Sequence, residues 1–214
     1  MSAKPLLDAL FEADRNLREA ETALLAYPKS EADADALARE FERATDQAFA
    51  LSDGVEAAAR LSRLADLCAQ AQGPRSADTL LRILNHPSPE VRVAAGEALR
   101  DFAYDRYAEV ARAIERAIDQ KLSGPALAEV PWILAEIGEP SALPLIGRML
   151  KHPDAEVVAS SIEALAELGD PAGAELLNPL LKDRRVVQLE EDDAGYTTTL
   201  GELASEALGE LSSR

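Results

Sequence analysis

Residues 134–140 read Leu-Ala-Glu-Ile-Gly-Glu-Pro, and residues 165–171 read Leu-Ala-Glu-Leu-Gly-Asp-Pro. The same offset of 31 residues, extended to 19 positions, keeps 8 identities. A second alignment, of residues 80–102 with 146–168, keeps 9 identities in 23 positions at an offset of 66. Since 66 is twice 33, the chain repeats a unit of about 31–33 residues, and a period of this length is typical of stacked repeat architectures.

Each unit has the pattern of a helix pair. In the best-defined unit, the spacing predicts a first helix over 142–150, a turn at Pro153, and a second helix over 155–168 that ends at Gly169. Helix pairs of this kind bury their apolar faces against the next pair. We therefore expect an all-α fold in which residues 73–214 form an α-solenoid of about four helix pairs.

Three motifs carry a resemblance to a known family. Residues 84–91 and 150–157 share the pattern Leu-x-His-Pro-x-x-Glu-Val, and residues 168–171 read Leu-Gly-Asp-Pro. Together with Glu-Ala-Leu at 97–99 and 163–165, they resemble HEAT repeats, more narrowly the bacterial HEAT-like type also found in phycobilisome lyases. The resemblance covers roughly residues 73–214. It implies a scaffold or adaptor that binds another protein, and it names no partner.

Residues 1–72 lack the repeat pattern and are expected to form an N-terminal helical module, either degenerate capping repeats or a separate unit. Leu10, Leu17 and Leu24 recur every seven residues, which predicts a helix with one apolar stripe. Such a stripe can pack within one chain or form the seam of a homodimer, and the sequence leaves both open.

The pattern departs from the repeat at two places. Residues 121–125 replace the His-Pro turn of the second unit, and Pro131 falls within its second helix, which predicts a late helix start or a kink. In the last unit, residues 186–199 place β-forming residues on both sides of a turn. We expect a small β-hairpin there, with a disordered acidic loop as the alternative.

Charge and cysteine content restrict the function. The 214 residues include 22 Lys and Arg against 39 Asp and Glu, for a net charge of −17. Such a chain repels nucleic acid and anionic membrane surfaces, so neither is an expected partner.

The single Cys68 and the lack of a signal peptide suggest the cytoplasm. His86 and His152 lie two units apart and cannot share a metal, and the chain lacks common nucleotide and zinc motifs, so we expect no cofactor and no enzymatic activity.

Aligning the second helices of the units separates a core side from an exposed side. The column opposite the apolar stripe places a carboxylate in three units and the only tryptophan, Trp132, in the fourth. We expect this column to line a concave, acidic groove that binds a partner, with Trp132 as its centre. The candidate partner-binding residues are Trp132, Glu97, Glu129, Glu136, Glu163 and Glu206, with Arg92 and Arg100 as a positive spot at one end.

Two interpretations of Trp132 stay open at this point. It is either an exposed anchor or, if Pro131 shifts the helix register, a core residue between the second and third units. The leading function is a non-catalytic scaffold whose acidic groove binds a basic or mixed-charge segment of another protein. The competing one is a structural spacer that dimerises through the N-terminal helices. A minor alternative is a bilin-lyase-like accessory subunit, although an acidic groove suits a dicarboxylate pigment poorly.

Overall fold

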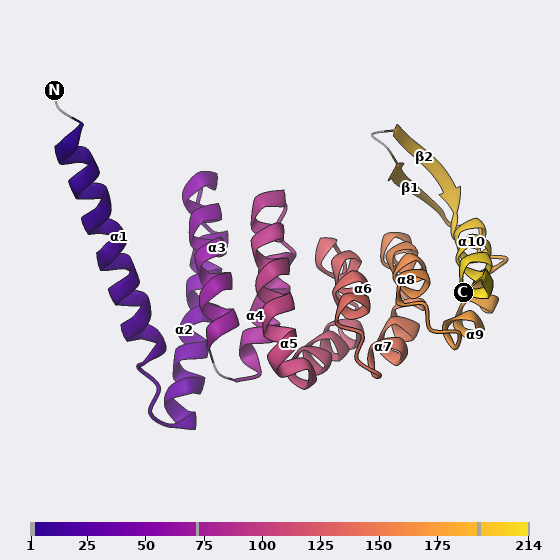
Figure 1. Ribbon diagram of the computed structural model, residues 1–214, viewed down its shortest axis with the longest axis horizontal. Coiled ribbons are helices and arrows are strands. Elements are labelled where there is room, and N and C mark those ends of the chain that lie inside the picture. Colours follow the sequence, from indigo (N-terminus) through magenta and orange to yellow (C-terminus); the bar gives the residue numbers. More distant parts are fainter. Residues whose placement is uncertain (1–2, 72, 192–193, 214) are drawn as a thin grey trace.

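The computed structural model describes residues 3–71, 73–191 and 194–213, and its helices stand side by side in an elongated row (Figure 1). The elements, in chain order, are α1 (Lys4–Leu25), α2 (Glu31–Phe49), α3 (Gly54–Gln70), α4 (Arg75–Leu84), α5 (Pro89–Asp119), α6 (Pro125–Ile137), α7 (Ala142–Met149), α8 (Ala155–Leu168), α9 (Gly173–Leu177), the 3₁₀ turn η1 (Asn178–Leu180), β1 (Val186–Glu191), β2 (Ala194–Thr199) and α10 (Leu200–Ser213).

From residue 73 onward the helices form four pairs, as the repeat predicts. The pairs are α4 with the first half of α5, the second half of α5 with α6, α7 with α8, and α9 with α10. Second helices pack on second helices, since α6 contacts α8 and α8 contacts α10. The predicted all-α solenoid is therefore confirmed. Helices α2 and α3 add a further pair that packs against α4 and α5, while a division of the chain at residue 72 stays a prediction.

One helix joins two of the repeats without a loop. Helix α5 continues from the second helix of one unit into the first helix of the next, with non-helical angles at Arg106 (φ −139°, ψ 45°). The Arg106 guanidinium lies 4.5 Å from the centroid of the Phe102 ring and donates a hydrogen bond to the carbonyl of Ala71, after α3. The change of direction is thus held by contacts to the core and to the preceding helix pair.

The unusual turn at residues 121–125 is completed by a side chain from the preceding unit. Asn85 Oδ1 accepts a hydrogen bond from the Ala126 amide at 3.2 Å, and its Nδ2 donates to the Ser123 carbonyl at 3.3 Å. Pro125 opens α6 directly after this turn, a position that suits proline. Of the two alternatives predicted here, the late start is therefore wrong and the kink stays a prediction. Pro131 lies buried inside a helix that runs to Ile137.

The predicted β-hairpin is confirmed. Strands β1 and β2 pair antiparallel from Val186↔Thr199 to Glu191↔Ala194, and residues 192 and 193 of the connection lie outside the described residues. Val187 is buried, β1 packs on α8, and β2 packs on α10. The Leu200 amide donates to the carbonyl of Arg185 at 3.0 Å, so α10 begins directly at the base of the hairpin.

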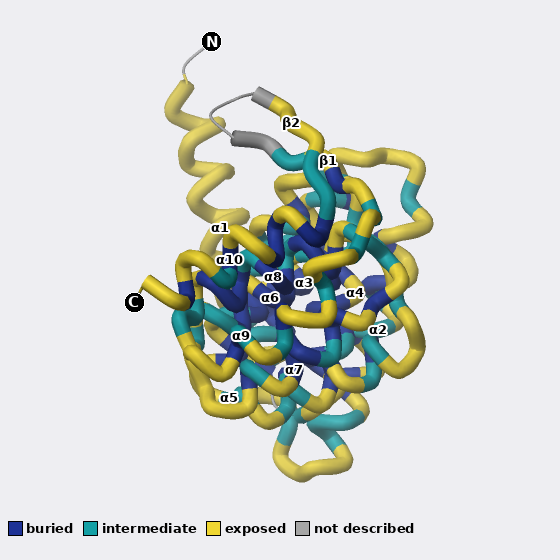
Figure 2. Tube along the Cα trace, turned by 90° about the vertical axis from the view of Figure 1, so that its right-hand side faces the viewer, coloured by how far each residue is buried: buried dark blue, intermediate teal, exposed yellow. Residues whose placement is uncertain are grey.

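A single apolar core runs along the row from α2 to α10, and α1 meets it only through the partly buried Leu25 at its end (Figure 2). Helix α1 contains no buried residue and touches α3 through an ion pair of Glu21 with Arg63 at 3.0 Å. Its stripe residues Leu10, Leu17 and Leu24 are 60%, 40% and 37% exposed. Helices α2 and α3 thus pack within the chain, whereas the stripe of α1 stays uncovered by it.

None of the helices in the described part of the chain combines the length and the apolar character that crossing a bilayer requires.

Candidate functional site

The candidate site lies on the second-helix face, by which we mean the exposed sides of α3, the first half of α5, α6, α8 and α10. Trp132 is 41% exposed on this face, while its neighbours Pro131 and Ile133 are buried. Pro131 does not turn the indole into the core. Of the two interpretations of Trp132, the structure thus supports the exposed residue.

Trp132 borders a hollow of about 260 Å³ between α6, α8, α10 and the hairpin, here called the Trp132 hollow. Its apolar lining comes from α8 and α10, and its carboxylates come from the same two helices. The hollow is lined by Trp132, Ile162, Glu163, Ala166, Glu167, Tyr196, Leu203, Glu206, Ala207 and Glu210. Three of the residues singled out in the sequence therefore meet in one place: Trp132, Glu163 and Glu206.

The other candidate residues lie apart from this hollow. Glu97 lines a separate, larger hollow of about 730 Å³ between α1, α3 and α5. Arg100 and Glu136 form an ion pair at 2.6 Å that joins α5 to α6. Arg92 donates hydrogen bonds to the carbonyls of the His-Pro turn, at 2.9 Å to the proline oxygen, and Glu129 is exposed on α6.

Three of the six glutamate and aromatic residues that line the Trp132 hollow were not among the candidates from the sequence. Glu167 and Glu210 lie four residues, or about one helical turn, after Glu163 and Glu206 of the exposed column. The same alignment of the second helices therefore contains them. Tyr196 comes from β2, is 39% exposed, and completes the hollow from outside the helices. No periodicity in the sequence connects a hairpin residue to a helix column.

The three helices around the Trp132 hollow carry negative charge without a basic residue of their own. Helix α6 contains two glutamates, and α8 and α10 contain three each, with no lysine, arginine or histidine within their bounds. Burial raises the pKa of the Glu163 carboxyl, and the neighbouring charge of Glu206 raises it further. Two carboxylates at this spot therefore repel each other without a counter-charge from these helices.

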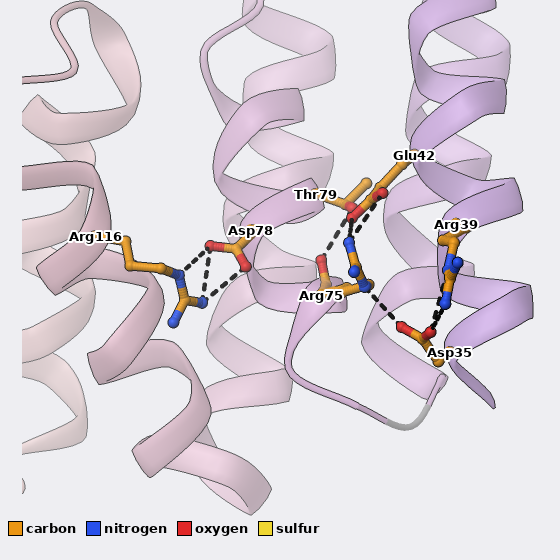
Figure 3. A network of polar contacts seen from close by, with 7 residues as sticks. All are labelled: Asp35, Arg39, Glu42, Arg75, Asp78, Thr79 and Arg116. Carbon is orange, nitrogen blue, oxygen red and sulfur yellow. Dashed lines mark hydrogen bonds and ion pairs between the residues drawn. The ribbon is translucent and has the colours of Figure 1, made fainter. Parts of the chain in front are cut away.

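The opposite layer, built from α2, α4, the second half of α5 and α7, pairs its acids with arginines (Figure 3). Arg75 on α4 lies 2.7 Å from Asp35 and 3.1 Å from Glu42, both on α2. Arg116 on α5 lies 2.7 Å from Asp78 on α4. Arg148 on α7 continues the series with carboxylates of α5. In this first-helix layer Arg75, Arg116 and Arg148 thus bridge to the preceding unit.

The two histidines and the cysteine, which lie outside the hollow, have structural roles. His86 Nδ1 accepts a hydrogen bond from the Ser88 amide at 3.1 Å, and His152 Nδ1 accepts one from the Asp154 amide at 3.2 Å. Both imidazoles therefore stabilise their turns. Cys68 is buried, and burial raises the pKa of its thiol to about 12, so it is poorly reactive. Within the described residues, no cluster of three or more His, Cys, Asp or Glu side chains could hold a metal ion.

Replacing Glu163 by glutamine is expected to stabilise the protein near neutral pH. A carboxyl whose pKa is raised on folding binds more protons in the folded state, so its contribution to stability falls as the pH rises through that pKa. Removing one of two repelling charges is worth about 0.5 kcal/mol, or roughly 1–2 °C in Tm for a chain of this size. Thermal unfolding followed by circular dichroism measures the shift.

The control for this prediction is Glu129→Gln, an exposed glutamate on α6. We expect that variant to leave Tm unchanged at either pH. The gain from Glu163→Gln should shrink when the scan is repeated near pH 4.5, where the wild-type carboxyl takes up a proton. A loss of stability in Glu163→Gln at neutral pH would contradict the argument.

Of the comparisons with known proteins, the matches to family models agree with the repeat architecture. A search of curated proteins finds no match. Among solved structures, the crystal structure of an engineered protein from the Northeast Structural Genomics Consortium is 16% identical, covering 91% of this chain and 97% of that chain, with a TM-score of 0.36. A family model described as HEAT repeats matches residues 114–190, and a model described as HEAT repeat matches residues 78–105. These two matches fall on the helix pairs described above, so the chain contains HEAT repeats over these residues.

Proposed function

We propose that this protein is a non-catalytic scaffold that holds another protein on its second-helix face around Trp132. HEAT repeats in general suggest protein interaction. The observation that carries the proposal is the contrast between the first-helix layer and the three helices around Trp132. Acids of the first-helix layer are paired with arginines of the next unit, whereas the helices around Trp132 supply glutamates and no basic residue.

The chemistry of this face suits a partner with a basic or mixed-charge segment. A tryptophan buries a large apolar area with little loss of rotamer freedom, and it is frequent among the residues that dominate binding energy. The glutamates around Trp132 attract positive charge, and the net charge of −17 disfavours nucleic acid and anionic lipid. A cytoplasmic location is part of the proposal and agrees with the single, buried Cys68.

Affinity capture from a lysate of the source cell tests the proposal with three immobilised proteins: wild type, Trp132→Ala and Tyr104→Ala. Tyr104 is 60% exposed on α5 and does not line the Trp132 hollow, so it controls for loss of an exposed aromatic ring. We expect a protein that the wild type and Tyr104→Ala retain and that Trp132→Ala loses. Equal capture by all three, with matching circular dichroism, would overturn the proposal.

The exposed stripe of α1 favours a second candidate function, a structural spacer that dimerises. Leu10, Leu17 and Leu24 are spaced by seven residues and remain uncovered in the single chain. Under this proposal, light scattering after gel filtration finds a dimer for the wild type and a monomer for Leu10→Ser/Leu17→Ser. Val55→Ser, which changes an exposed residue on α3, should remain a dimer. A wild-type monomer at high concentration would exclude this function.

A further inference from the structure

We propose that the Trp132 hollow binds one arginine side chain of the partner, with the guanidinium between the two aromatic rings and the glutamates of α8 and α10. The proposal rests on the proposed function and names the group that this site recognises. Trp132 comes from α6 and Tyr196 from β2, and both rings are about two-fifths exposed at the hollow. Glu163, Glu206 and Glu210 are among the carboxylates that line it.

A cation is the ligand that this lining selects. Aromatic ring faces attract cations, and the attraction grows when the cation is partly removed from water. The apolar residues Ile162 and Leu203 line the same hollow as the carboxylates. Glu163 is half-buried beside Glu206, so a cation would relieve a repulsion that the free protein contains. An anionic or neutral group would leave that repulsion in place.

The volume of the Trp132 hollow favours a single side chain as its ligand. The shape of the guanidinium favours arginine over lysine. The volume of about 260 Å³ lies below the range of roughly 300–1,000 Å³ that is common for small-molecule and cofactor sites. A guanidinium is planar, so it can stack on a ring while its N–H groups donate to carboxylates at the edge. A lysine ammonium offers one compact charge and cannot stack in this way.

The protein already uses the same chemistry inside its own fold. The guanidinium of Arg106 lies over the Phe102 ring at 4.5 Å, and that of Arg82 lies over the Phe49 ring at 5.4 Å. Along the first-helix layer, arginines such as Arg116 bridge to carboxylates of the preceding unit (Figure 3). The partner's arginine would supply to Glu163 and Glu206 the counter-charge that the chain's own arginines supply to that layer.

The test titrates the full-length protein with three capped pentapeptides, Gly-Ser-X-Ser-Gly, in which X is arginine, citrulline or lysine. Citrulline has nearly the shape of arginine but carries no charge. Trp132 is the only tryptophan, so its fluorescence reports on the hollow directly. We expect a saturable change with the arginine peptide, and binding weaker by about tenfold or more with citrulline and by several-fold with lysine.

Two double variants with the same change of charge separate a site from general attraction to an acidic protein. Glu163→Gln/Glu206→Gln alters the hollow, and Glu12→Gln/Glu19→Gln alters exposed glutamates of α1 at the other end of the row (Figure 1). We expect the first variant to weaken binding of the arginine peptide by about tenfold and the second by less than about twofold.

Three outcomes would overturn the proposal: no saturable change with the arginine peptide, equal binding of the arginine peptide and either other peptide, or equal weakening in the two double variants. These results are distinguishable from failure of the proposed function. If Trp132→Ala loses partner capture while arginine and citrulline bind alike, the second-helix face still binds a protein and only the arginine assignment is wrong. If Trp132→Ala keeps capture, the proposed function itself fails.

Discussion

Phe102→Ala is expected to lower the free energy of unfolding by about 3–5 kcal/mol, the usual cost of removing a fully buried phenylalanine ring. Phe102 is 1% exposed and is among the largest fully buried side chains in the described core. The substitution leaves a cavity in the middle of the solenoid, where neighbouring units cannot collapse without losing their own contacts. Urea denaturation followed by circular dichroism measures the loss.

Phe102 lies where two units join, so its removal is expected to destabilise both of them. Its ring supports the Arg106 guanidinium at the point where α5 changes direction between two units. In a repeat protein, stability is the sum of the units and of the interfaces between neighbours, so a cavity at a joint weakens two units together.

Tyr104→Ala serves as the control, because Tyr104 lies two residues away in the same helix and is exposed. We expect it to change the free energy of unfolding by no more than about 0.5 kcal/mol. Similar losses in Phe102→Ala and Tyr104→Ala would show that Phe102 does not stabilise this joint.

Features that recur in each unit were predictable from the sequence. The Leu-x-His-Pro turns, the terminal glycines and the apolar columns repeat at a fixed period, so several copies of a weak signal reinforce one another. The same alignment found Trp132, Glu163 and Glu206, because exposure on a helix follows from residue spacing alone. It also contained Glu167 and Glu210, one turn further along the helix.

Features that occur once in the chain were not predictable in this way. The hairpin was expected, but its pairing pattern does not reveal that Tyr196 borders the same hollow as Trp132. Arg92 and Arg100 were expected to form a positive spot on this face, yet each is held by a partner that spacing does not indicate, the His-Pro turn and Glu136. Asn85 completes a turn 38 to 41 residues away, which is a tertiary contact between units.

Gly201→Ala is expected to destabilise the last helix pair by about 2–3 kcal/mol, because no space exists for a Cβ atom. A Cβ built on Gly201 would lie 2.8 Å from the carbonyl oxygen of Leu181 and 3.0 Å from that of Asp183. These are backbone atoms, and the Gly201 amide itself donates to the Asp183 carbonyl at 3.0 Å. The substitution must therefore move the start of α10 away from the chain that leads into the hairpin.

Gly209, on the same helix, provides a control for which the expected change in stability has the opposite sign. A Cβ on Gly209 would meet nothing within 4 Å, so Gly209→Ala is expected to stabilise α10 by about 0.5–1 kcal/mol through its higher helix propensity. Chemical denaturation followed by circular dichroism compares the two variants. Stabilisation by both substitutions would contradict the packing described at Gly201.

This pair of variants also connects the fold to the Trp132 hollow. Helix α10 supplies Glu206 and Glu210, and its displacement opens the hollow beside Trp132. In Gly201→Ala we expect the Trp132 emission to shift to longer wavelength at a lower urea concentration than the loss of helical circular dichroism, because the terminal pair separates before the rest of the row. Gly209→Ala should keep the two transitions as close as they are in the wild type. If they also coincide in Gly201→Ala, the last pair unfolds together with the whole solenoid, and the hollow is as stable as the core.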